Sequence, residues 1–346
     1  MKVRTLLVDS SYLFKKSVNG AKNTYTDAFG QIGGLYSFLT TVRKLIRDYS
    51  INKVVLCWDG ENGGIARYRI DRNYKSNRKS KDWFKKTKLT PNEIILEKKK
   101  KISHLKQKKR IQAYAEELFL RQIEVDEIEA DDIIAAYCYK YNNKEEIFLY
   151  SSDRDFVQLL NLNITIIFPT HDKPITKKNF FTAFGYHYAN SLPFKIISGD
   201  TSDNIPGTGN LRETKILKHF PDLRAKKTTV NEICKLAKEL NEKRVIEGKK
   251  PFTYFENLLK NKERLKINHR LMNLSEPMLN DVAREELEQL DLPLSPVDRN
   301  NKNLFKLMEE DEFLSVFGGT FVNYVEPFFV VIMAEKKKFE DFIKKG

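Results

Sequence analysis

The 346-residue sequence has few cysteines and no long apolar segment. Its three cysteines, Cys57, Cys138 and Cys234, lie far apart, so they predict reduced thiols rather than a disulfide framework. No run approaches the roughly 20 apolar residues that cross a bilayer, so we expect no membrane partner. The first residues enter a strand-like pattern without the apolar core of a signal peptide. We therefore expect a cytoplasmic protein.

Acidic residues are scarce in one segment of the chain. The whole sequence carries 61 Lys and Arg against 47 Asp and Glu, a net charge of +14. Residues 67–110 contain 18 basic and 4 acidic side chains, so this segment accounts for the whole excess and the rest is neutral. Such a segment attracts phosphate, because neutralising a polyanion releases its condensed counterions. A solvated lysine-rich helix or a basic targeting tract would have the same composition, so charge alone does not decide.

Strand-like and helix-like segments alternate along the first part of the chain. Buried strands are predicted at 3–9, 53–58, 146–151 and 164–168, and helices at 32–49, at about 92–122 and from about 130. This alternation predicts an α/β layer with a mainly parallel sheet. Beyond about residue 192 the pattern changes to helices joined by short loops, with a glycine-bearing turn at 204–209.

Acidic residues follow the predicted strands. Three strands end on aspartates, namely Asp9, Asp59, and Asp153 with Asp155. Ligands of an open parallel sheet bind outside the carboxyl ends of the strands, so these side chains are expected to converge. A predicted helix start and a later loop add Glu129, Asp131, Asp132, Asp200 and Asp203. A single aspartate usually caps a helix or stabilises a turn, but the same residue at successive strand ends indicates a shared site.

Carboxylates gathered in this way repel one another and require cations. No histidine or cysteine belongs to the group, and oxygen ligands alone favour Mg²⁺ or Mn²⁺ over zinc. Two such ions about 4 Å apart can activate water and stabilise the attacking and leaving oxygens at a phosphodiester. The acidic group and the basic segment together predict a nuclease that uses two Mg²⁺ or Mn²⁺ ions.

Four separate blocks resemble the signature motifs of the 5′ nuclease superfamily. They are Asp9 after Leu-Leu-Val, Glu129 to Asp132, Ser152 to Phe156, and Gly199 to Gly207. The superfamily holds the flap endonucleases, the 5′-nuclease domains of bacterial DNA polymerases, and the bacteriophage 5′→3′ exonucleases and ribonuclease H. The blocks occur in the family's order over about residues 1–220. The chain is most similar to the stand-alone phage members.

The resemblance implies a PIN-like fold, with helices flanking a central, mainly parallel sheet. It also implies a basic helical arch and a helix–three-turn–helix element that binds DNA. The implied ligands of the catalytic ion are Asp9, Asp59, Glu129, Asp131 and Asp153; those of the second ion are Asp155, Asp200 and Asp203, and Asp132 fits either ion. Lys75 and Arg78, at the base of the arch, are implied to contact the scissile phosphate and supply positive charge in catalysis.

The implied DNA-binding residues lie in two places. The arch, at about 67–122, contributes Tyr74, Lys75, Arg78, Lys98, Lys99, Lys100 and Lys101, the last four as an electrostatic funnel. The glycine turn and the helix after it contribute Gly207, Gly209, Arg212 and Lys215. The family usually has a lysine two residues after the second glycine. Here Leu211 replaces it, which weakens the expectation for this turn.

We thus expect a nuclease core at 1–190 that includes the arch, a helix–three-turn–helix region at 191–275, and a C-terminal helical region of unknown role at 276–346. The expected function is a structure-selective 5′ nuclease, flap endonuclease or 5′→3′ exonuclease, in DNA replication and primer removal. Its substrates would be DNA with a 5′ flap, or an RNA/DNA hybrid through ribonuclease H activity. The alternatives are a PIN-like ribonuclease acting on free RNA and a non-catalytic DNA-binding homologue. A monomer is expected, and replication proteins are candidate partners.

Overall fold

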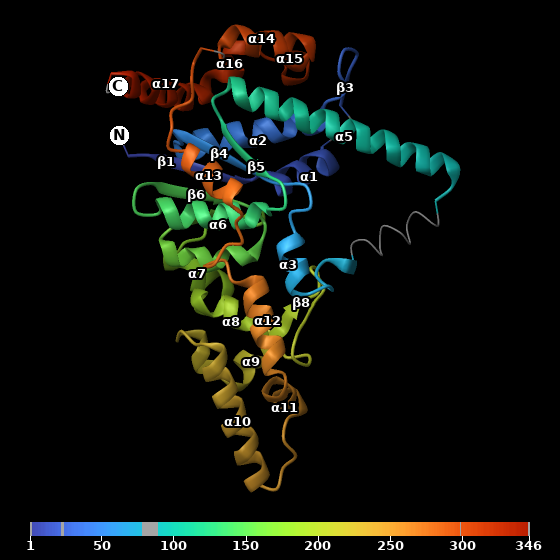
Figure 1. Ribbon diagram of the computed structural model, residues 1–346, viewed down its shortest axis with the longest axis vertical. Helices are drawn as coiled ribbons and strands as arrows, with labels where there is room; N and C mark the ends of the chain where they lie inside the picture. The colour runs from blue at the N-terminus through green and yellow to red at the C-terminus, as the bar shows by residue number, and fades with distance from the viewer. Residues whose placement is uncertain (1, 22–23, 78–88, 298, 345–346) are drawn as a thin grey trace.

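Five parallel strands form the central sheet of the protein, whose computed structural model describes residues 2–21, 24–77, 89–297 and 299–344. The strand order is β5-β4-β1-β6-β7, and every neighbouring pair is parallel (Figure 1). The strands are β1 (Arg4–Asp9), β4 (Lys53–Asp59), β5 (Arg121–Val125), β6 (Glu146–Tyr150) and β7 (Thr165–Ile167). The expected α/β fold with a mainly parallel sheet is confirmed.

Each face of the sheet has its own hydrophobic core, because successive residues of a strand point to opposite faces. Leu7 of β1 lies in the core that contains α6 (Ala130–Tyr141) and the 3-10 helix η1 (Arg154–Leu162). Leu6 and Val8 lie in the core that contains α1 (Ser10–Gly20) and α2 (Gly33–Tyr49). Burial on both faces explains why the strands are continuous apolar runs.

The C-terminal helices complete the second of these cores. They are α14 (Asn301–Glu310), α15 (Phe313–Phe317), α16 (Phe321–Val325) and α17 (Phe329–Ile343), and they pack around α2 and α5 (Pro91–Glu117). Phe313, Tyr324 and Val331 are fully buried there. Arg121 of β5 also forms a buried ion pair with Glu335 of α17, at 2.5 Å between Nη2 and Oε2. Residues 276–346, which matched no motif, therefore help to build the core around the sheet.

The helix predicted at about 92–122 was too long. α5 ends at Glu117, and the next residues form β5 rather than more helix. Phe119 has a φ of 57°, which breaks the helix, and its side chain is buried. Residues 121–125 then alternate between buried and more exposed positions, as in a strand at the edge of a sheet. The alternating pattern of this strand covers only five residues and directly follows a long helical pattern, so the sequence did not predict it as a separate strand.

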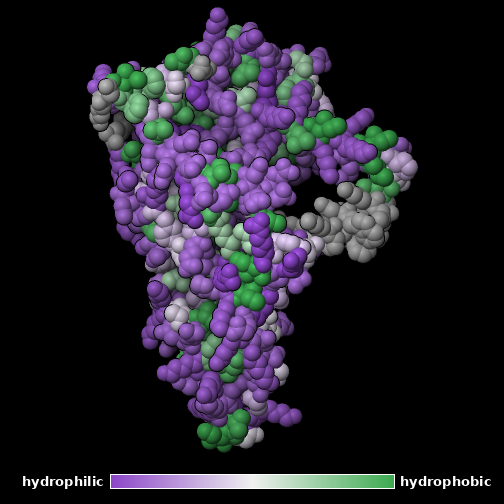
Figure 2. Space-filling model, in the orientation of Figure 1, coloured by the Kyte–Doolittle hydropathy of each residue, from purple (hydrophilic) through white to green (hydrophobic). Residues whose placement is uncertain are grey.

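The first half of α5 projects away from the body, whereas its second half packs beside the sheet (Figure 1). A capping box between Thr90 and Glu93 starts the helix. The buried residues of α5 all lie in its second half, between Gln107 and Ala115. The projecting half exposes Ile95, Leu96, Ile102 and Leu105. Figure 2 shows these apolar side chains interspersed with hydrophilic ones along the projection.

The end of the molecule beyond the sheet is helical (Figure 1). It consists of α8 (Ser191–Ser198), α9 (Glu213–His219), α10 (Val230–Ile246), α11 (Thr253–Lys260) and α12 (Lys262–Met272). Three further helices are α3 (Ile65–Ile70), α7 (Lys177–Phe184) and α13 (Asp281–Gln289). Two short antiparallel pairs are β2 (Tyr25–Thr26) with β3 (Gly30–Gln31) and β8 (Gly199–Asp200) with β9 (Ile205–Pro206). Short 3-10 helices lie at η2 (Tyr188–Asn190), η3 (Pro221–Arg224) and η4 (Glu326–Phe328). Among the described residues, no helix is both long and apolar enough to cross a membrane.

Candidate active site

Three of the predicted site aspartates lie at or just after the carboxyl ends of three neighbouring strands. β1 lies between β4 and β6 in the sheet. Asp9 ends β1, Asp59 ends β4, and Asp153 follows shortly after the end of β6. The three residues therefore lie along one edge of the sheet, where the ligand crevice of an open parallel sheet is found.

Hydrogen bonds hold this edge in place. Asp9 caps α1 by accepting from a backbone N–H in the first turn (2.9 Å), and its other oxygen accepts from the Ser151 hydroxyl (2.8 Å). The same hydroxyl accepts from the backbone N–H of Asp153 (3.1 Å). Asp59 accepts from the backbone N–H of Ala130 (3.0 Å), which ties the start of α6 to the end of β4. Ser151 was not among the predicted site residues, because a serine after a strand carries no distinctive sequence signal.

Asp9 and Asp131 hold negative charge that no basic side chain neutralises. Within the described parts of the chain, neither residue forms an ion pair with Lys or Arg. Burial raises the pKa of Asp9 from 3.8 to about 6, and the charges of Asp59 and Asp153 act in the same direction. Burial also raises the pKa of Asp131 well above its ordinary value, and Asp153 and Asp9 add to the effect. A bound cation would relieve this excess charge.

Asp155 and Asp200 are both paired with a basic side chain of the protein, Lys195. The Lys195 ammonium of α8 forms an ion pair with both, at 2.8 Å from Asp200 Oδ2. Burial raises the pKa of Asp155 to about 6, with Asp153 adding to the effect and Lys195 opposing it. Burial acts in the same direction on Asp200, but Lys195 and Ser202 outweigh it and lower the pKa to about 2. Lys195 was missed at the sequence level, because a lysine in a helix is usually solvated.

Replacing Lys195 by Met is expected to destabilise the metal-free protein by about 3 kcal/mol, because two largely buried carboxylates would lose their cation. A divalent ion should then bind more tightly, since it no longer competes with an ammonium. Urea unfolding in EDTA measures the first effect, and calorimetric titration with Ca²⁺ measures the second. Lys195→Arg, which keeps the charge, serves as the control. Weaker Ca²⁺ binding to Lys195→Met would show that the ammonium supports ion binding instead.

Glu129 contacts three other side chains near the base of the arch. Arg67 Nη1 lies 2.6 Å from Glu129 Oε2, the Lys75 ammonium forms an ion pair with Oε1, and the Tyr74 hydroxyl donates to Oε2 at 3.0 Å. Burial acts to raise the pKa of Glu129, but Arg67 and Lys75 outweigh it and lower the pKa. Glu129 is thus held ionised by basic side chains, close to Asp131 in the chain.

Asp132 does not join the acidic group, and its assignment as an ion ligand is corrected here. Its two oxygens bind Arg67, at 2.5 Å from Nη1 and 3.0 Å from Nη2, and it accepts from the backbone N–H of Met278 (3.0 Å). Consecutive helix residues point about 100° apart, so Asp131 faces the acidic group while Asp132 faces the core. Arg67 was not predicted for this role.

Tyr74 is also placed differently from the prediction. Only 6% of its surface is exposed, and its hydroxyl bonds to Glu129, so its ring is packed inside the protein. Lys75 adopts a φ of 52°, and its backbone N–H donates to the Asp203 carbonyl (2.8 Å). This bond joins the base of the arch to the loop that holds Asp200 and Asp203. Arg78 lies outside the described residues.

The other predicted DNA-binding residues are on the surface or in the glycine turn. Lys98, Lys99, Lys100 and Lys101 are exposed on the projecting half of α5. Gly209 has a φ of 113°, and at Gly207 a Cβ would lie 2.2 Å from the Ser198 carbonyl oxygen, so both positions require glycine. Arg212 is exposed, whereas Lys215 donates to the Asn210 carbonyl (2.9 Å). Leu211 is buried, so this departure from the family pattern places a core residue where a lysine was expected.

The acidic side chains line two hollows. A cavity of about 20 Å³ is lined by Asp131, Asp155, Asp200 and Asp203 together with Lys195. Beside it, a cleft of about 480 Å³ is lined by Asp153, Asp155, Asp200 and Arg212. In the part of the chain that the structure describes, no three of these ligands are close enough together to hold an ion as they stand. The oxygen donors and the raised pKa values nevertheless fit a divalent cation.

The stability of the metal-free protein should depend on the ionisation of Asp9. In the folded state Asp9 keeps its proton up to a pKa of about 6, against 3.8 ordinarily, so its ionisation lowers stability as the pH rises through this window. Asp9→Asn removes this loss. In EDTA, the variant should therefore gain stability relative to the wild type as the pH rises from about 4 to about 7, with no further gain above that. A stability difference that does not change with pH would contradict this.

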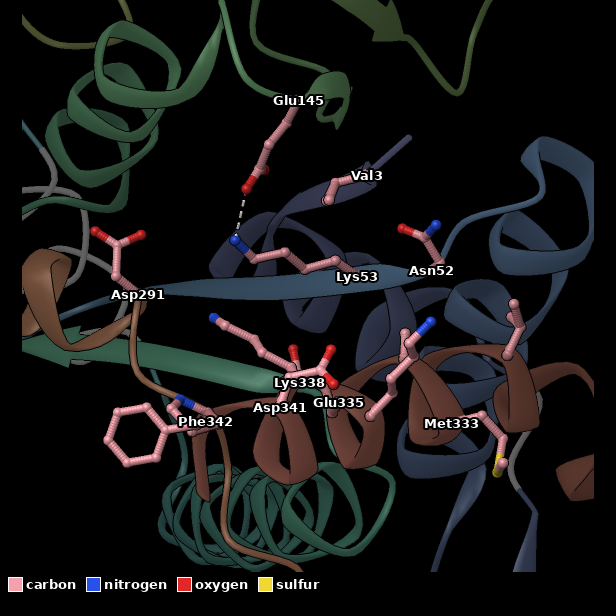
Figure 3. A pocket seen from close by; sticks show the side chains of 14 residues that line it. Val3, Asn52, Lys53, Glu145, Asp291, Met333, Glu335, Lys338, Asp341 and Phe342 are labelled. Carbon is pink, nitrogen blue, oxygen red and sulfur yellow. Dashed lines mark hydrogen bonds and ion pairs between the residues drawn. The ribbon is translucent and has the colours of Figure 1, made fainter. Parts of the chain in front are cut away.

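A separate pocket of about 780 Å³ lies at the opposite, amino-terminal edge of the sheet (Figure 3). Several of its charged residues form ion pairs: Lys53 pairs with Glu145 at 2.8 Å, and Glu335 with Arg121. Burial lowers the pKa of Lys338, across from Lys53, to about 8. We regard this pocket as a seam between the sheet and α17 rather than the candidate site.

Comparison with known proteins agrees with this architecture. Residues 4–185 match the family described as 5′–3′ exonuclease, N-terminal resolvase-like domain. The 5′–3′ exonucleases of Buchnera aphidicola subsp. Schizaphis graminum and Mycoplasmopsis pulmonis are 25% and 28% identical; the alignments cover 63% of this chain in each case and 71% and 67% of those proteins. The flap endonuclease of bacteriophage T5, solved with DNA and metal ions, has the same fold, with a TM-score of 0.59 at 18% identity, over 89% of this chain and 99% of that one. The chain therefore belongs to the 5′–3′ exonuclease family, within the 5′ nuclease superfamily.

Proposed function

We propose that the protein is a structure-selective 5′ nuclease that hydrolyses DNA phosphodiesters near the junction of a 5′ single strand and a duplex. The observation that carries the proposal is the acidic group at the carboxyl edge of the parallel sheet, in a chain of the 5′–3′ exonuclease family. DNA replication and primer removal are the processes in which such an activity is needed. The T5 flap endonuclease, which was solved with DNA and metal ions, supports the proposal through its fold.

Mg²⁺ or Mn²⁺ is the proposed cofactor, and two ions are proposed. The proposed ligands of the first ion are Asp9, Asp59, Glu129, Asp131 and Asp153; those of the second ion are Asp155, Asp200 and Asp203. When bound, such ions lower the pKa of water and stabilise negative charge at a phosphodiester. The chain's own part is to orient the ligands through Ser151 and to keep Glu129 ionised beside Lys75. Contact between Lys75 and a phosphate at this edge is part of the proposal.

The proposed path of the substrate follows the charge of the chain. A 5′ single strand would pass the base of the arch, where Lys75 lies, and meet the exposed lysines of α5. Duplex DNA would contact the glycine turn, where the backbone comes close to the surface, and Arg212 beside it. The division into a core at 1–190 and a DNA-binding region at 191–275 remains part of this proposal.

One assay separates the proposed function from its alternatives. A 5′-flap DNA, a nicked duplex, an RNA/DNA hybrid and a single-stranded RNA are each incubated with Mg²⁺ and with EDTA. We expect Mg²⁺-dependent cleavage of the flap and of the hybrid. Cleavage of the free RNA in preference to the flap would support a PIN-like ribonuclease. Binding to the flap without turnover in either Mg²⁺ or Mn²⁺ would support a non-catalytic homologue.

Changing all four of Lys98, Lys99, Lys100 and Lys101 to Gln is expected to weaken the salt dependence of flap binding. The slope of log affinity against log salt should fall by up to about 3, at about 0.7 for each phosphate contact on a single strand. The single-turnover rate with saturating enzyme should change little, because these side chains lie away from the acidic group. Lys302→Gln with Lys306→Gln, exposed on α14, is the control. A large loss of rate with an unchanged slope would contradict the arch assignment.

A further inference from the structure

A groove between α8, α10 and α12, called here the basic groove, combines an apolar floor with a basic rim. Its volume is about 930 Å³. The floor includes Leu192, Ile196, Val230, Leu259 and Leu265. The rim carries Lys227, Lys235, Lys238, Lys262, Lys266 and Arg270. No acidic residue lines the groove, although the chain outside 67–110 is neutral overall. The residues that line the groove therefore carry an excess of positive charge, and that charge lies on the rim.

The basic groove is separate from the candidate active site. The two hollows lie on opposite faces of α8: Leu192, Pro193 and Ile196 face the groove, whereas Phe194 and Lys195 face the cleft that holds Asp155 and Asp200. A ligand in the groove would therefore not occupy the cleft. It would instead touch the helix whose other face carries Lys195.

The basic side chains of the rim are available to a ligand. Lys235 and Lys238 form ion pairs along their own helix with glutamates at 3.9 Å and 3.7 Å, and Lys266 pairs with Glu263 at 2.7 Å. All three pairs are exposed, and exposed pairs contribute little to stability. A ligand with several acidic groups can replace these contacts at little cost.

The apolar floor and the basic rim together indicate which class of ligand fits the groove. Duplex DNA is held through its phosphates by polar and basic groups, and its backbone would leave the apolar floor unused. A peptide with both acidic and apolar side chains matches both parts, since its apolar side chains cover the floor while its carboxylates meet the rim. We propose that the basic groove binds an acidic segment of a partner protein through apolar side chains that enter the floor. This proposal does not depend on the proposed nuclease function.

A binding experiment tests the proposal with defined peptides. The probe is a fluorescein-labelled peptide of about 12 residues made of Asp, Glu, Leu and Phe. Two control peptides have Asn and Gln in place of the acids, or Ser in place of Leu and Phe. Fluorescence anisotropy should show binding of the probe that is at least about tenfold tighter than that of either control. Equal binding of the probe and the controls would overturn the proposal.

Charge reversal locates the binding site. Lys235→Glu with Lys262→Glu should weaken probe binding by about tenfold or more, whereas Lys243→Glu, on the same helix α10 but outside the groove, should change it by less than about twofold. Melting temperatures establish that each variant is folded. Unchanged probe binding in the double variant would overturn the proposal. A loss of duplex DNA binding in that variant without a loss of probe binding would instead assign the groove to DNA.

Cys234 provides a readout inside the groove. It is half-buried and lines the groove, whereas Cys57 and Cys138 are buried in the core, so it should react first with iodoacetamide in the folded protein. Saturating probe should slow this reaction by about fivefold or more, and the Ser-containing control peptide should not. Protection by duplex DNA but not by the probe would overturn the proposal.

Discussion

Replacing Asp131 by Asn should lower the rate of flap cleavage by about 1000-fold or more, which is about 4 kcal/mol of transition-state stabilisation. At the same time it should raise the thermal stability of the protein in EDTA. Both effects have one cause. Burial and the neighbouring carboxylates raise the pKa of Asp131, so the ionised group is unfavourable until a cation binds. Single-turnover cleavage in Mg²⁺ and thermal unfolding in EDTA measure the two effects.

The matched control for Asp131→Asn is the same change at Asp132. Because Asp132 bonds to Arg67 and to a backbone N–H, Asp132→Asn should lower stability. It should reduce cleavage much less than Asp131→Asn does. Ca²⁺ titration distinguishes the two as well, since Asp131→Asn should weaken binding more. If Asp132→Asn removed ion binding while Asp131→Asn did not, the assignment of the two residues would have to be reversed.

Replacing Arg67 by Met should lower the free energy of unfolding by about 3–5 kcal/mol. Arg67 is buried, and it is the cation for two buried carboxylates, at 2.6 Å from Glu129 and 2.5 Å from Asp132. It also donates to the Leu271 carbonyl (3.0 Å), so it links α3 to α12. Its loss would leave Lys75 as the cation for Glu129 and, among the described residues, only the Met278 N–H as a donor to the buried Asp132. Urea unfolding at neutral pH measures the effect.

A double variant tests the cause of that loss. Asp132→Asn in the Arg67→Met background should restore part of the lost stability, because it removes one of the stranded charges. If the loss came only from missing packing around the guanidinium, the second change would restore nothing. Arg67→Lys should fall between the wild type and Arg67→Met, since an ammonium keeps the charge but not the two-pronged contact with Asp132.

The positions of Asp9, Asp59 and Asp153 could be predicted because they depend on local patterns. Each follows a short apolar run, and parallel strands bring their carboxyl ends to one edge of the sheet. The glycine turn was also visible, since Gly207 and Gly209 occupy positions that tolerate little else. Such features are set by backbone geometry over a few residues.

The parts that could not be predicted depend on contacts between distant segments. Asp131 and Asp132 are adjacent and identical in type, and only Arg67, on another helix, decides which of them faces the core. Tyr74 was predicted to bind DNA, and its burial and its bond to Glu129 depend on residues far away in the chain. The role of Lys195 could not be predicted because its partners are two carboxylates from other elements. Sequence patterns report on secondary structure, whereas these choices are made by tertiary packing.

The second hydrophobic core has a consequence for the synthesis of the protein. Leu6 and Val8 of β1 are translated long before Phe313, Tyr324 and Ile332, with which they share that core. Until translation reaches these later residues, α1 and α2 cover this face of the sheet but the core between them and the C-terminal helices is incomplete. Because β1 also carries Asp9, the core beside this strand of the candidate active site stays incomplete until residues 313–332 have been translated.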